Sequence, residues 1–332
     1  MTSPKRILLL LVLFAGLGLG FYIQQGLESR SPTLSIRIAV SQTPLSTPFY
    51  VAQAQGYFAD HGIEVELLPY VGGHRCFNAL IQGEADLATT SDSVIMFNSF
   101  GDKQFSILAS FVESDNDIKI VSAPDQHLRD ARELRGKRIG IIHNSSSEFF
   151  LHTLLLIHGV PAETITLVSL RPDQMVAALD AGEIDAAALW EPFAQEAAQL
   201  SSHGQPILNS RGIYTLSFNL ITMQDQATAQ LEAHRRVIAA LNDATRFIAV
   251  NPARSQRIIA TQLQRDPHKI GHGWDDYLFK LSLSNSLITT LEHEARWALN
   301  NKRVAQQSMP NYRALFDERA LIATDATASQ IQ

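Results

Sequence analysis

Residues 36–95 alternate short apolar runs with polar or glycine-rich turns and helix-like segments. The β-type runs are Ile36–Val40, Ile63–Leu68 and Ala85–Ala88, and each is followed by a turn and then by a helical pattern. This alternation is typical of parallel βαβ units, in which small ligands bind in the crevice beyond the carboxyl ends of the strands. The turns at those ends carry short polar side chains and no nucleophile–base pair. They therefore indicate a binding cleft rather than a reaction site.

A second α/β half repeats the first. The segment ALIQGEADLA at 79–88 is matched by ALDAGEIDAA at 178–187, a spacing of about 100 residues that predicts two similar lobes rather than a solenoid. Both segments read as helix, glycine, acidic residue, apolar residue, aspartate and strand. After Ile213 the sequence offers only one more strand, Thr215–Met223, and the remainder has a helical pattern that we expect to wrap the first lobe.

These patterns predict an α/β fold of two sandwiches joined by crossover strands. The first lobe is expected to comprise residues 31–115 and 216–332, and the second lobe residues 116–215. Residues 1–30 are set apart as a signal or anchor followed by a tether. The length of 332 residues accommodates two lobes of roughly 100–150 residues each.

The amino terminus has the pattern of an export signal. Lys5 and Arg6 precede an uninterrupted apolar run from Ile7 to Ile23. Its length, about 17 residues, is at the short limit for spanning a bilayer. Because no A-x-A cleavage site follows, we favour an uncleaved anchor, with a cleaved signal peptide as the alternative. The positive flank stays inside in both cases, so the rest is predicted to be periplasmic, tethered to the outer face of the cytoplasmic membrane or soluble after cleavage.

Composition and motifs exclude several classes of function. The net charge of -6, with basic residues scattered along the chain, gives no sign of nucleic-acid binding. Cys76 is the only cysteine, so an intramolecular disulfide and a cysteine-rich metal or iron–sulfur site are excluded. No histidine pair has zinc-ligand spacing, and the sequence lacks a P-loop, a G-x-G-x-x-G fingerprint and a G-x-S-x-G elbow. We expect no cofactor, no metal and no catalytic residue.

The turn from Asn144 to Ser147, between a strand and a helix, is the strongest candidate for ligand contact. Free N–H groups at a helix start, together with hydroxyls, form an anion or carbonyl site, although simple capping of the helix is the alternative. The matching turn of the first half holds Thr89 to Asp92. A carboxylate at Asp92 repels an anionic ligand, so Asp92 is expected to cap the next helix or to bind an amino group.

Trp190 and Glu191 follow the repeated strand of the second half and are expected to line the same cleft. The indole could stack on a flat ligand or pack in the floor of the cleft. Glu191 could bind an amine, and simple anions are disfavoured if Glu191 and Asp92 both face the cleft. The candidate ligand-binding residues are Ser41, Gln42, Thr43, Gly72, Gly73, Thr89, Thr90, Ser91, Asp92, Asn144, Ser145, Ser146, Ser147, Trp190, Glu191 and Asn219.

Several of these runs resemble a known family. PFYVA at 48–52, GYF at 56–58, GIEV at 62–65 and GEAD at 83–86 resemble the exported substrate-binding proteins of ABC transporters. The likeness is to the nitrate/sulfonate/taurine type, which includes binders of thiamine pyrimidine precursors. LRGKRIG at 134–140, the serine-rich turn at Ser145 and WEP at 190–192 fit the same family. The resemblance covers about residues 36–299 and does not identify the ligand as sulfonate, nitrate, pyrimidine or another solute.

The resemblance implies a two-lobed, type II periplasmic-binding-protein-like fold that closes on a small organic or oxyanion-type ligand. By position, the cleft would be lined by residues 41–45, 72–73, 89–93 and 144–147 together with Trp190. The implied partners are an ABC permease and its ATPase subunits. The N-terminal segment is expected to contact the inner membrane, and the protein itself is expected to be a monomer. The lack of a cleavage site departs from the family pattern and puts a freely diffusing form in doubt.

Two other functions remain open at this point. One is a membrane-tethered ligand-sensing domain that acts with a separate signalling partner. The other is a thiamine-pyrimidine biosynthetic enzyme with a similar order of lobes. The pattern of that enzyme carries a cysteine cluster, whereas this chain has Cys76 alone.

Overall fold

The computed structural model describes residues 34–126, 128–200, 207–271 and 273–331. The chain divides into two units, residues 1–34 and 35–332, and the second contains the fold. The predicted membrane segment, Ile7–Ile23, lies outside the described residues. Within the described ranges, none of the helices is both long enough and apolar enough to span a bilayer.

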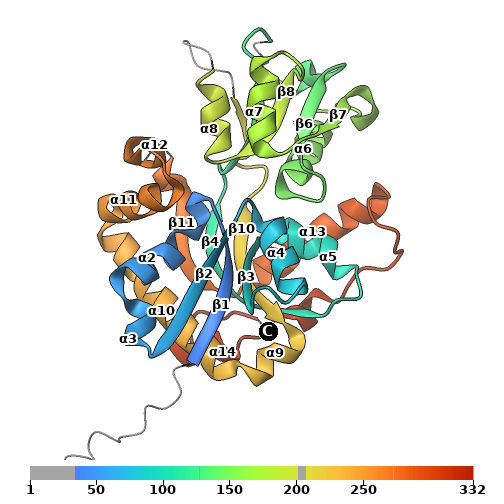
Figure 1. Cartoon of the computed structure of the whole chain (residues 1–332). Coiled ribbons are helices and arrows are strands. Elements are labelled where there is room, and N and C mark those ends of the chain that lie inside the picture. Colours follow the sequence, from blue (N-terminus) through green and yellow to red (C-terminus); the bar gives the residue numbers. More distant parts are fainter. Residues whose placement is uncertain (1–33, 127, 201–206, 272, 332) are drawn as a thin grey trace, which may run out of the picture. The chain divides into compact units, whose positions relative to one another are not determined.

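Two β-sheets of mixed strand direction organise residues 35–332 (Figure 1). The larger has six strands in the order β11-β4-β10-β3-β1-β2, and the smaller has five in the order β7-β6-β8-β5-β9. The strands of the larger sheet are β1 (Leu34–Ser41), β2 (Ile63–Tyr70), β3 (Leu87–Ser91), β4 (Phe105–Ser114), β10 (Leu216–Met223) and β11 (Tyr277–Ser282). The strands of the smaller sheet are β5 (Ile118–Ser122), β6 (Arg138–Ile141), β7 (Thr166–Ser169), β8 (Ala186–Trp190) and β9 (Ile207–Asn209).

Each sheet combines a parallel βαβ pair with antiparallel strands that connect the two sheets. β1 pairs in parallel with β3, and β6 pairs in parallel with both β7 and β8. β10 is antiparallel to β3 and β4, and β5 is antiparallel to β8 and β9. The chain passes from the larger to the smaller sheet through residues 115–117 and returns through residues 210–215. Strands from residues 34–114 and 216–282 thus share one sheet. The limits of the two lobes, residues 31–115 with 216–332 and residues 116–215, stay a prediction.

The repeated segment has the same structural role in both halves. Arg37 N donates to Asp86 Oδ2 over 2.8 Å, and its guanidinium binds Asp86 Oδ1 (2.9 Å) and the carbonyl of the turn glycine (3.1 Å). Arg138 N donates to Asp185 Oδ2 over 2.7 Å, and its guanidinium makes the same two contacts at 2.9 and 2.8 Å. Charge-assisted, two-point pairing of this kind has a defined geometry. The pairing fixes β1 against the turn before β3 in the first half, and β6 against the turn before β8 in the second half.

Helices cover both faces of the larger sheet, with α2, α3, α10 and α11 on one side and α4, α5 and α13 on the other (Figure 1). The helices that accompany this sheet are α2 (Thr47–Gln55), α3 (Tyr57–Asp60), α4 (Gly73–Ile81), α5 (Asp92–Ser99), α9 (Gln224–Ala229), α10 (Leu231–Val250), α11 (Pro252–Leu263), α12 (Pro267–Gly271), α13 (Asn285–Asn300) and α14 (Arg319–Thr324). Short 3-10 helices span Pro44–Ser46, Ala131–Leu134, Ala162–Thr164, Trp274–Asp276 and Tyr312–Leu315. The chain after residue 230 therefore packs mainly against the first half, as the sequence predicts.

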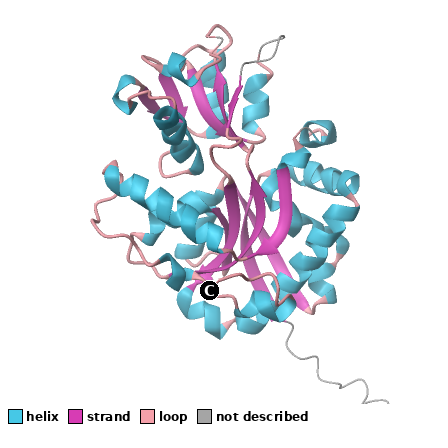
Figure 2. Cartoon of the chain, turned by 180° about the vertical axis from the view of Figure 1, so that it is seen from behind, coloured by secondary structure: helices cyan, strands magenta, loops and turns pink. Residues whose placement is uncertain are grey.

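The smaller sheet lies between α6 (Ser146–Ile157) and the pair α7 (Pro172–Asp180) and α8 (Phe193–Ala198), as Figures 1 and 2 show. Successive side chains of a strand point to opposite faces. Ala187 and Leu189 of β8 accordingly belong to the apolar core formed with α7 and α8. Ala188, between them, faces the α6 side, and Trp190 at the end of β8 reaches the cleft described below.

The structure corrects the expectation of a single strand after Ile213, because β11 forms a second one at the edge of the larger sheet. β11 pairs antiparallel with β4. Its side chain at Leu278 is 60% exposed, and Lys280 is also exposed. An edge strand with one apolar and one charged residue on its outer face has no clear two-residue alternation, which is why the sequence pattern missed it. The lysine is a common means of protecting such an edge.

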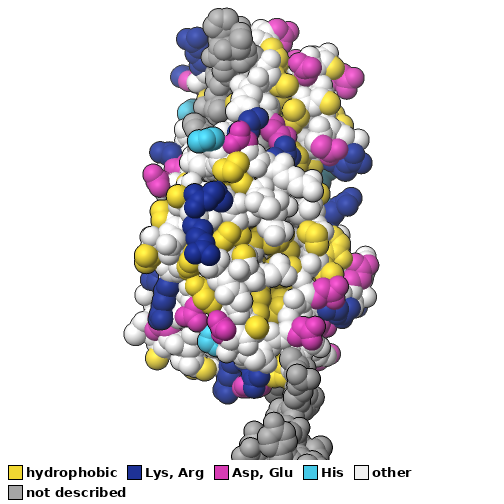
Figure 3. Space-filling model, turned by 60° about the vertical axis from the view of Figure 1, so that its left-hand side comes forward, with side chains coloured by type: hydrophobic (Ala, Val, Ile, Leu, Met, Phe, Trp, Pro, Cys, Tyr) yellow, Lys and Arg dark blue, Asp and Glu magenta, His cyan; other side chains and the backbone are white. Residues whose placement is uncertain are grey.

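Helix α2 begins at Thr47 and ends at Gln55, because Gly56 adopts the left-handed conformation (φ 81°) that ends a helix. Strand β5 begins at Ile118, so Asn116 and Asp117 belong to the crossing segment before it. On the face shown in Figure 3, lysine and arginine side chains are interspersed with aspartate and glutamate, without a continuous basic stripe.

Candidate ligand-binding site

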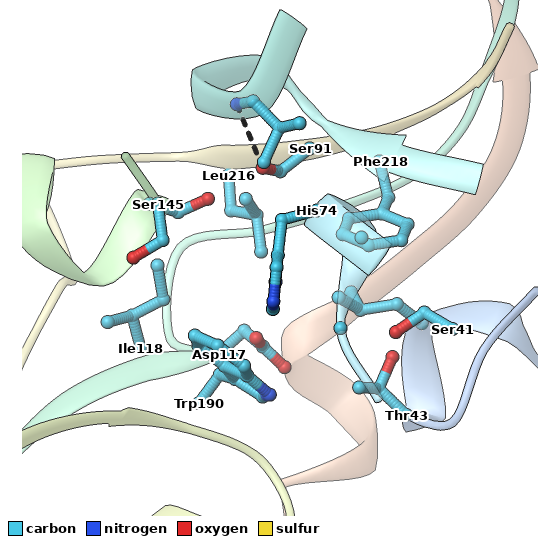
Figure 4. A pocket seen from close by; sticks show the side chains of 15 residues that line it. Ser41, Thr43, His74, Ser91, Asp117, Ile118, Ser145, Trp190, Leu216 and Phe218 are labelled. Carbon is cyan, nitrogen blue, oxygen red and sulfur yellow. Dashed lines mark hydrogen bonds between the residues drawn. The ribbon is translucent and has the colours of Figure 1, made fainter. Parts of the chain in front are cut away.

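A pocket lies where strand ends and helix starts of the two halves meet (Figure 4), with about 370 Å³ of empty space including the part open to solvent. Its wall on the side of the larger sheet comprises Ser41, Thr43, Leu45, Gly72, Gly73, His74, Ser91, Val94, Leu216 and Phe218. The other wall comprises Asp117, Ile118, Ser145, Ser146 and Trp190. The pocket is therefore at the carboxyl ends of parallel strands, where the βαβ pattern predicts it.

Half of the predicted ligand-binding residues line this pocket, and half do not. Those that line it are Ser41, Thr43, Gly72, Gly73, Ser91, Ser145, Ser146 and Trp190. Those that are absent from its wall are Gln42, Thr89, Thr90, Asp92, Asn144, Ser147, Glu191 and Asn219. Sequence reasoning did not single out His74, Val94, Asp117, Ile118, Leu216 or Phe218, all of which line the pocket.

The start of α4 lies at the pocket because its N-cap residue and its first residue are both glycines, Gly72 and Gly73. Gly72 has φ 85°, a conformation that side chains rarely adopt. A Cβ atom at Gly73 would lie 2.9 Å from Phe218 Cζ and 3.0 Å from the Cα atom of Thr90. No side chain caps the first turn of α4. Arg75 N donates to the carbonyl of Gly72 over 3.2 Å, which leaves the N–H groups of Gly73 and His74 and the positive end of the helix dipole for an anionic ligand.

The start of α6 is open in the same way. Ser145 is its N-cap residue, but its side chain accepts no hydrogen bond from the first turn. Ser145 Oγ instead donates to the carbonyl of Ile142 over 2.6 Å and lies 2.9 Å from Ser147 Oγ. Simple capping, the alternative interpretation of this turn, does not describe its geometry. The structure thus places two uncapped helix starts, one from each half, at one pocket.

Three buried hydrogen-bond donors of the pocket wall have no partner in the protein. They are Ser41 Oγ, Thr43 Oγ1 and Trp190 Nε1, on side chains that are at most 9% exposed. Buried polar groups are nearly always hydrogen-bonded, so unpaired donors around a pocket point to a bound molecule or to water. The lining residues include no lysine or arginine. Burial lowers the pKa of His74, which keeps this ring neutral near pH 7.

Asp117 is the one carboxylate in the pocket wall. It lies in the crossing segment before β5 and is 1% exposed. Tyr277 donates its hydroxyl proton to Asp117 Oδ1 over 2.8 Å, whereas Oδ2 has no partner. Burial raises the pKa of Asp117 to about 7. The signal that could have identified this residue is its place at the junction of the two predicted lobes, where a charged side chain has access to the cleft.

Asp92, by contrast, is not a cleft residue. It is fully buried and accepts hydrogen bonds from Tyr214 Oη and from Ser217 N, the second over 3.0 Å. Ser93 N donates to its Oδ1 over 2.8 Å, and Ser93 Oγ donates to Glu294 of α13. Burial raises the pKa of both Asp92 and Glu294, because it disfavours the charged form, and the charge of Asp92 raises the pKa of Glu294 further. Asp92, the first residue of α5, therefore binds the crossing segment and β10, while the neighbouring Ser93 binds α13.

Glu191 likewise turns away from the pocket. Its Oε1 forms an ion pair with Lys119 Nζ at 2.7 Å, and its Oε2 accepts from Gln195 N at the start of α8 over 3.1 Å. It lines a separate polar depression together with Arg211 and Asp276, which pair with each other. Because neither Asp92 nor Glu191 faces the cleft, these two carboxylates do not disfavour simple anions there.

Four of the other absent residues have structural partners, namely Thr89, Asn144, Ser147 and Asn219, whereas the buried Thr90 Oγ1 has none in the protein. Thr89 Oγ1 accepts from Ser41 N over 2.9 Å, and Asn219 Oδ1 accepts from Ser110 Oγ over 2.6 Å. Asn144 has φ 56° and donates its backbone N–H to Glu148 over 2.8 Å. Gln42 is exposed. Among residues 34–126, 128–200, 207–271 and 273–331, no three His, Cys, Asp or Glu side chains are grouped as ligands for a metal ion.

Comparisons with known proteins agree with this architecture. The chain is 26% identical over 193 residues to a Bacillus subtilis (strain 168) protein named for binding aliphatic sulfonates, an alignment that covers 56% of this chain and 57% of that protein. The chain thus matches somewhat over half the length of this relative. The alkanesulfonate-binding protein SsuA from Xanthomonas axonopodis pv. citri, solved bound to MOPS, superposes with a TM-score of 0.76 at 19% identity. That superposition covers 87% of this chain and 100% of the other.

The fold is shared more widely. The desulfurization enzyme DSZB superposes with a TM-score of 0.66 at 15% identity, over 89% of this chain and 99% of that enzyme. The similarities in structure confirm the predicted two-lobed, periplasmic-binding-protein-like α/β fold. A family model described as NMT1/THI5 like matches residues 43–255, which span β3, both crossing segments and every residue of the pocket wall except Ser41. This chain therefore belongs to the NMT1/THI5-like family.

Proposed function

We propose that this protein is the solute-binding component of an ABC transporter and that it captures a small organic sulfonate or a related oxyanion. The observation that carries the proposal is the set of unpartnered donors at Ser41, Thr43 and Trp190, beside the uncapped starts of α4 and α6. A sulfonate has three acceptor oxygens and no donor. Neutral donors and helix dipoles hold such a group without a lysine or arginine. The relative named for binding aliphatic sulfonates supports the same class of ligand.

Ligand contact is proposed for the predicted residues that line the pocket, Ser41, Thr43, Gly72, Gly73, Ser91, Ser145, Ser146 and Trp190. The two lobes are proposed to hinge at residues 115–117 and 210–215, because these short segments are the only strand-to-strand crossings between the described sheets. A ligand that bridges donors of both lobes binds the closed form more tightly, and by that difference it shifts the population towards closure.

Delivery to a permease, export and tethering belong to the same proposal. The segment Ile7–Ile23 would hold the monomer at the periplasmic face of the cytoplasmic membrane, as its basic flank and apolar run predict. Recovery of a soluble protein that lacks this segment, after osmotic shock of the cells, would contradict tethering but not ligand binding.

Binding without turnover is proposed, although the fold is also used by a desulfurization enzyme. The pocket wall offers no nucleophile beside a base. Cys76 is fully buried, is not part of the pocket wall, and has a pKa raised by burial to about 12, so its thiolate is suppressed.

The test is calorimetry on the full-length protein in mild detergent, with ethanesulfonate, propanesulfonate and butanesulfonate as ligands and acetate as the control. We expect saturable binding of at least one sulfonate and compaction of the protein in small-angle scattering. Absence of heat with every sulfonate, at millimolar concentration, would refute the proposed class of ligand. Native mass spectrometry of freshly purified protein would identify a retained solute directly.

A further inference from the structure

One carboxylate beside the larger sheet binds both segments that connect the two sheets. Asp276 ends the short 3-10 helix Trp274–Asp276, which leads directly into the edge strand β11. Its Oδ2 accepts a hydrogen bond from Asn116 Nδ2 over 2.7 Å, and its Oδ1 forms an ion pair with Arg211. Asn116 belongs to the crossing segment of residues 115–117, and Arg211 belongs to that of residues 210–215. Asp276 thus joins three stretches of chain that are distant in sequence.

Two further contacts belong to the same junction. Tyr277, the next residue, donates its hydroxyl proton to Asp117 Oδ1 over 2.8 Å. Ser210 Oγ donates to the carbonyl of Asp115 over 2.7 Å and so links the two crossing segments directly. The bond from Ser210 joins the segments only to each other. Asp276 also fixes both of them to the larger sheet, because β11 pairs with β4.

The arrangement of Asp276 differs from that of an ordinary surface ion pair. The Asp276 side chain is 17% exposed, whereas that of Arg211 is 54% exposed. A half-exposed ion pair by itself contributes little to stability. What the carboxylate provides is a shared anchor, since each of its two oxygens binds a different crossing segment. A movement of one segment is therefore transmitted to the other.

The ligand pocket depends on how the two halves are placed relative to each other. Ser41 and Thr43 lie on the side of the larger sheet, and Ser145 and Trp190 lie on the other side. Two segments that bend independently allow more relative orientations of the lobes than two segments that bend together. Only some of these orientations bring the four groups around one ligand. The apparent affinity falls in proportion to the fraction of molecules that has such an orientation.

We propose that Asp276 is a positioning residue for ligand binding, because it couples the two crossing segments so that the lobes close along one path. Asp276 does not line the ligand pocket, and it belongs instead to the separate polar depression beside Glu191. The proposal rests on the proposed function and identifies the residue that controls how the closed form is reached. Coupling requires both arms of the carboxylate, so loss of either arm should have the effect of losing both.

The test is a double-mutant cycle on the full-length protein, measured by calorimetry with the tightest of ethanesulfonate, propanesulfonate and butanesulfonate. N116A removes one arm, R211Q removes the other, and D276A removes both. We expect each of these three variants to weaken binding about fivefold. N116A/R211Q should lie within about twofold of either single variant, whereas two independent contacts would multiply to about 25-fold.

D243A is the matched control, because Asp243 also joins distant segments. Its Oδ2 lies 2.8 Å from His61 Nε2, 182 residues away, but both residues belong to the helices beside the larger sheet. D243A should leave the affinity unchanged. In small-angle scattering, ligand-free D276A, N116A and R211Q should have a larger radius of gyration than the unmodified protein and D243A. The ligand-saturated proteins should all have the same radius.

The outcomes separate this proposal from the proposed function. Unchanged affinity in R211Q, or a multiplied loss in N116A/R211Q, overturns the coupling role and leaves the proposed function standing. R211Q changes an exposed side chain, so it decides the question even if D276A does not fold. Absence of binding by every sulfonate to the unmodified protein refutes the proposed function. In that case the scattering of the ligand-free variants still decides, and equal radii overturn the coupling role.

Discussion

Arg303 donates to the carboxylate of Glu148, and so joins the segment after α13 to the first turn of α6. Glu148 is fully buried, while the Arg303 side chain is 27% exposed. The same carboxylate accepts the backbone N–H of Asn144 over 2.8 Å and lies 3.2 Å from His143 Nδ1. An ion pair beside the proposed ligand turn thus connects the segment that follows α13 on the larger sheet with helix α6 on the smaller one.

We predict that R303Q destabilises the protein by about 3 kcal/mol, because removal of one partner leaves a buried carboxylate without its cation. Urea unfolding measures this loss. R303Q should also shift the ligand-free protein towards a more open form in small-angle scattering.

R132Q is the matched control, since Arg132 is 69% exposed and pairs with a partner two residues away. It should change stability by less than about 1 kcal/mol. The double variant R303Q/E148Q should recover part of the loss, and equal stability of R303Q and R132Q would contradict a role for the buried pair.

Gly73→Ala should weaken ligand binding more than about tenfold, because its Cβ atom would press on the backbone of Thr90 and displace the start of α4. The measurement is calorimetry with the tightest sulfonate found. Gly271→Ala is a suitable control because its Cβ atom would make only an ordinary contact, 3.4 Å from Gln256 Oε1. Unchanged affinity in Gly73→Ala would show that the start of α4 is not part of the binding site.

Trp190→Phe isolates the role of the indole N–H group. The substitution keeps an aromatic ring at the cleft and removes the unpartnered Nε1 donor. Loss of a hydrogen bond to a charged ligand should reduce affinity about tenfold, whereas Trp190→Ala should reduce it further because ring contact is lost too. Equal affinities for the unmodified protein and Trp190→Phe, with loss only in Trp190→Ala, would assign Trp190 to stacking alone.

The buried carboxyl of Asp117 predicts an unusual dependence of stability on pH. Its pKa is raised by burial to about 7, from about 3.9 in an unfolded chain. Between these values the folded state holds a proton that the unfolded state has released, so this group contributes less to stability as the pH rises towards 7. The amide introduced by D117N does not ionise, so this variant should equal the unmodified protein near pH 4 and exceed it near pH 8, by at most about 4 kcal/mol.

Comparing the two proteins by urea unfolding at each pH removes the contributions they share. The raised pKa values of Asp92 and Glu294 also lower the stability of the fold as the pH rises, and they do so equally in both proteins. The histidines at positions 74, 152 and 234, whose pKa values burial lowers, increase the stability as the pH rises, again equally in both proteins. D115N is the control and should give a difference that does not vary with pH. If the stability difference between D117N and the unmodified protein also did not vary with pH, a raised pKa of Asp117 would be contradicted.

Cys76 provides a probe of opening at α4. It is the only cysteine of the chain, it is fully buried, and burial raises its pKa to about 12. The folded protein should therefore resist thiol reagents at pH 8, and urea-unfolded protein should react at once. A ligand bound at the start of α4 should slow the reaction further, by suppressing local opening. Rapid, stoichiometric labelling of the folded protein would contradict the burial of Cys76.

Local pattern was sufficient for the architecture. Two α/β halves are predicted from apolar runs of strand length, turns with glycine and a repeated GEAD-like segment. In the structure the repeated aspartates have equivalent partners, since Asp86 pairs with Arg37 and Asp185 pairs with Arg138. The same pattern singled out the turns at Gly72 and Ser145, and both residues lie in the pocket wall. It missed β11, because an edge strand with exposed Leu278 and Lys280 does not alternate clearly.

What the sequence determined by itself is the order of strands and helices and the polar turns that follow the strands, since both depend on neighbours a few residues apart. Only the tertiary structure decided which acidic side chain faces the pocket. Asp92 is bound by Tyr214, 122 residues away, and Glu191 by Lys119, 72 residues away, whereas Asp117 keeps one oxygen free. The partner of a buried charge is set by packing between distant segments, and short-range periodicity carries no information about that packing.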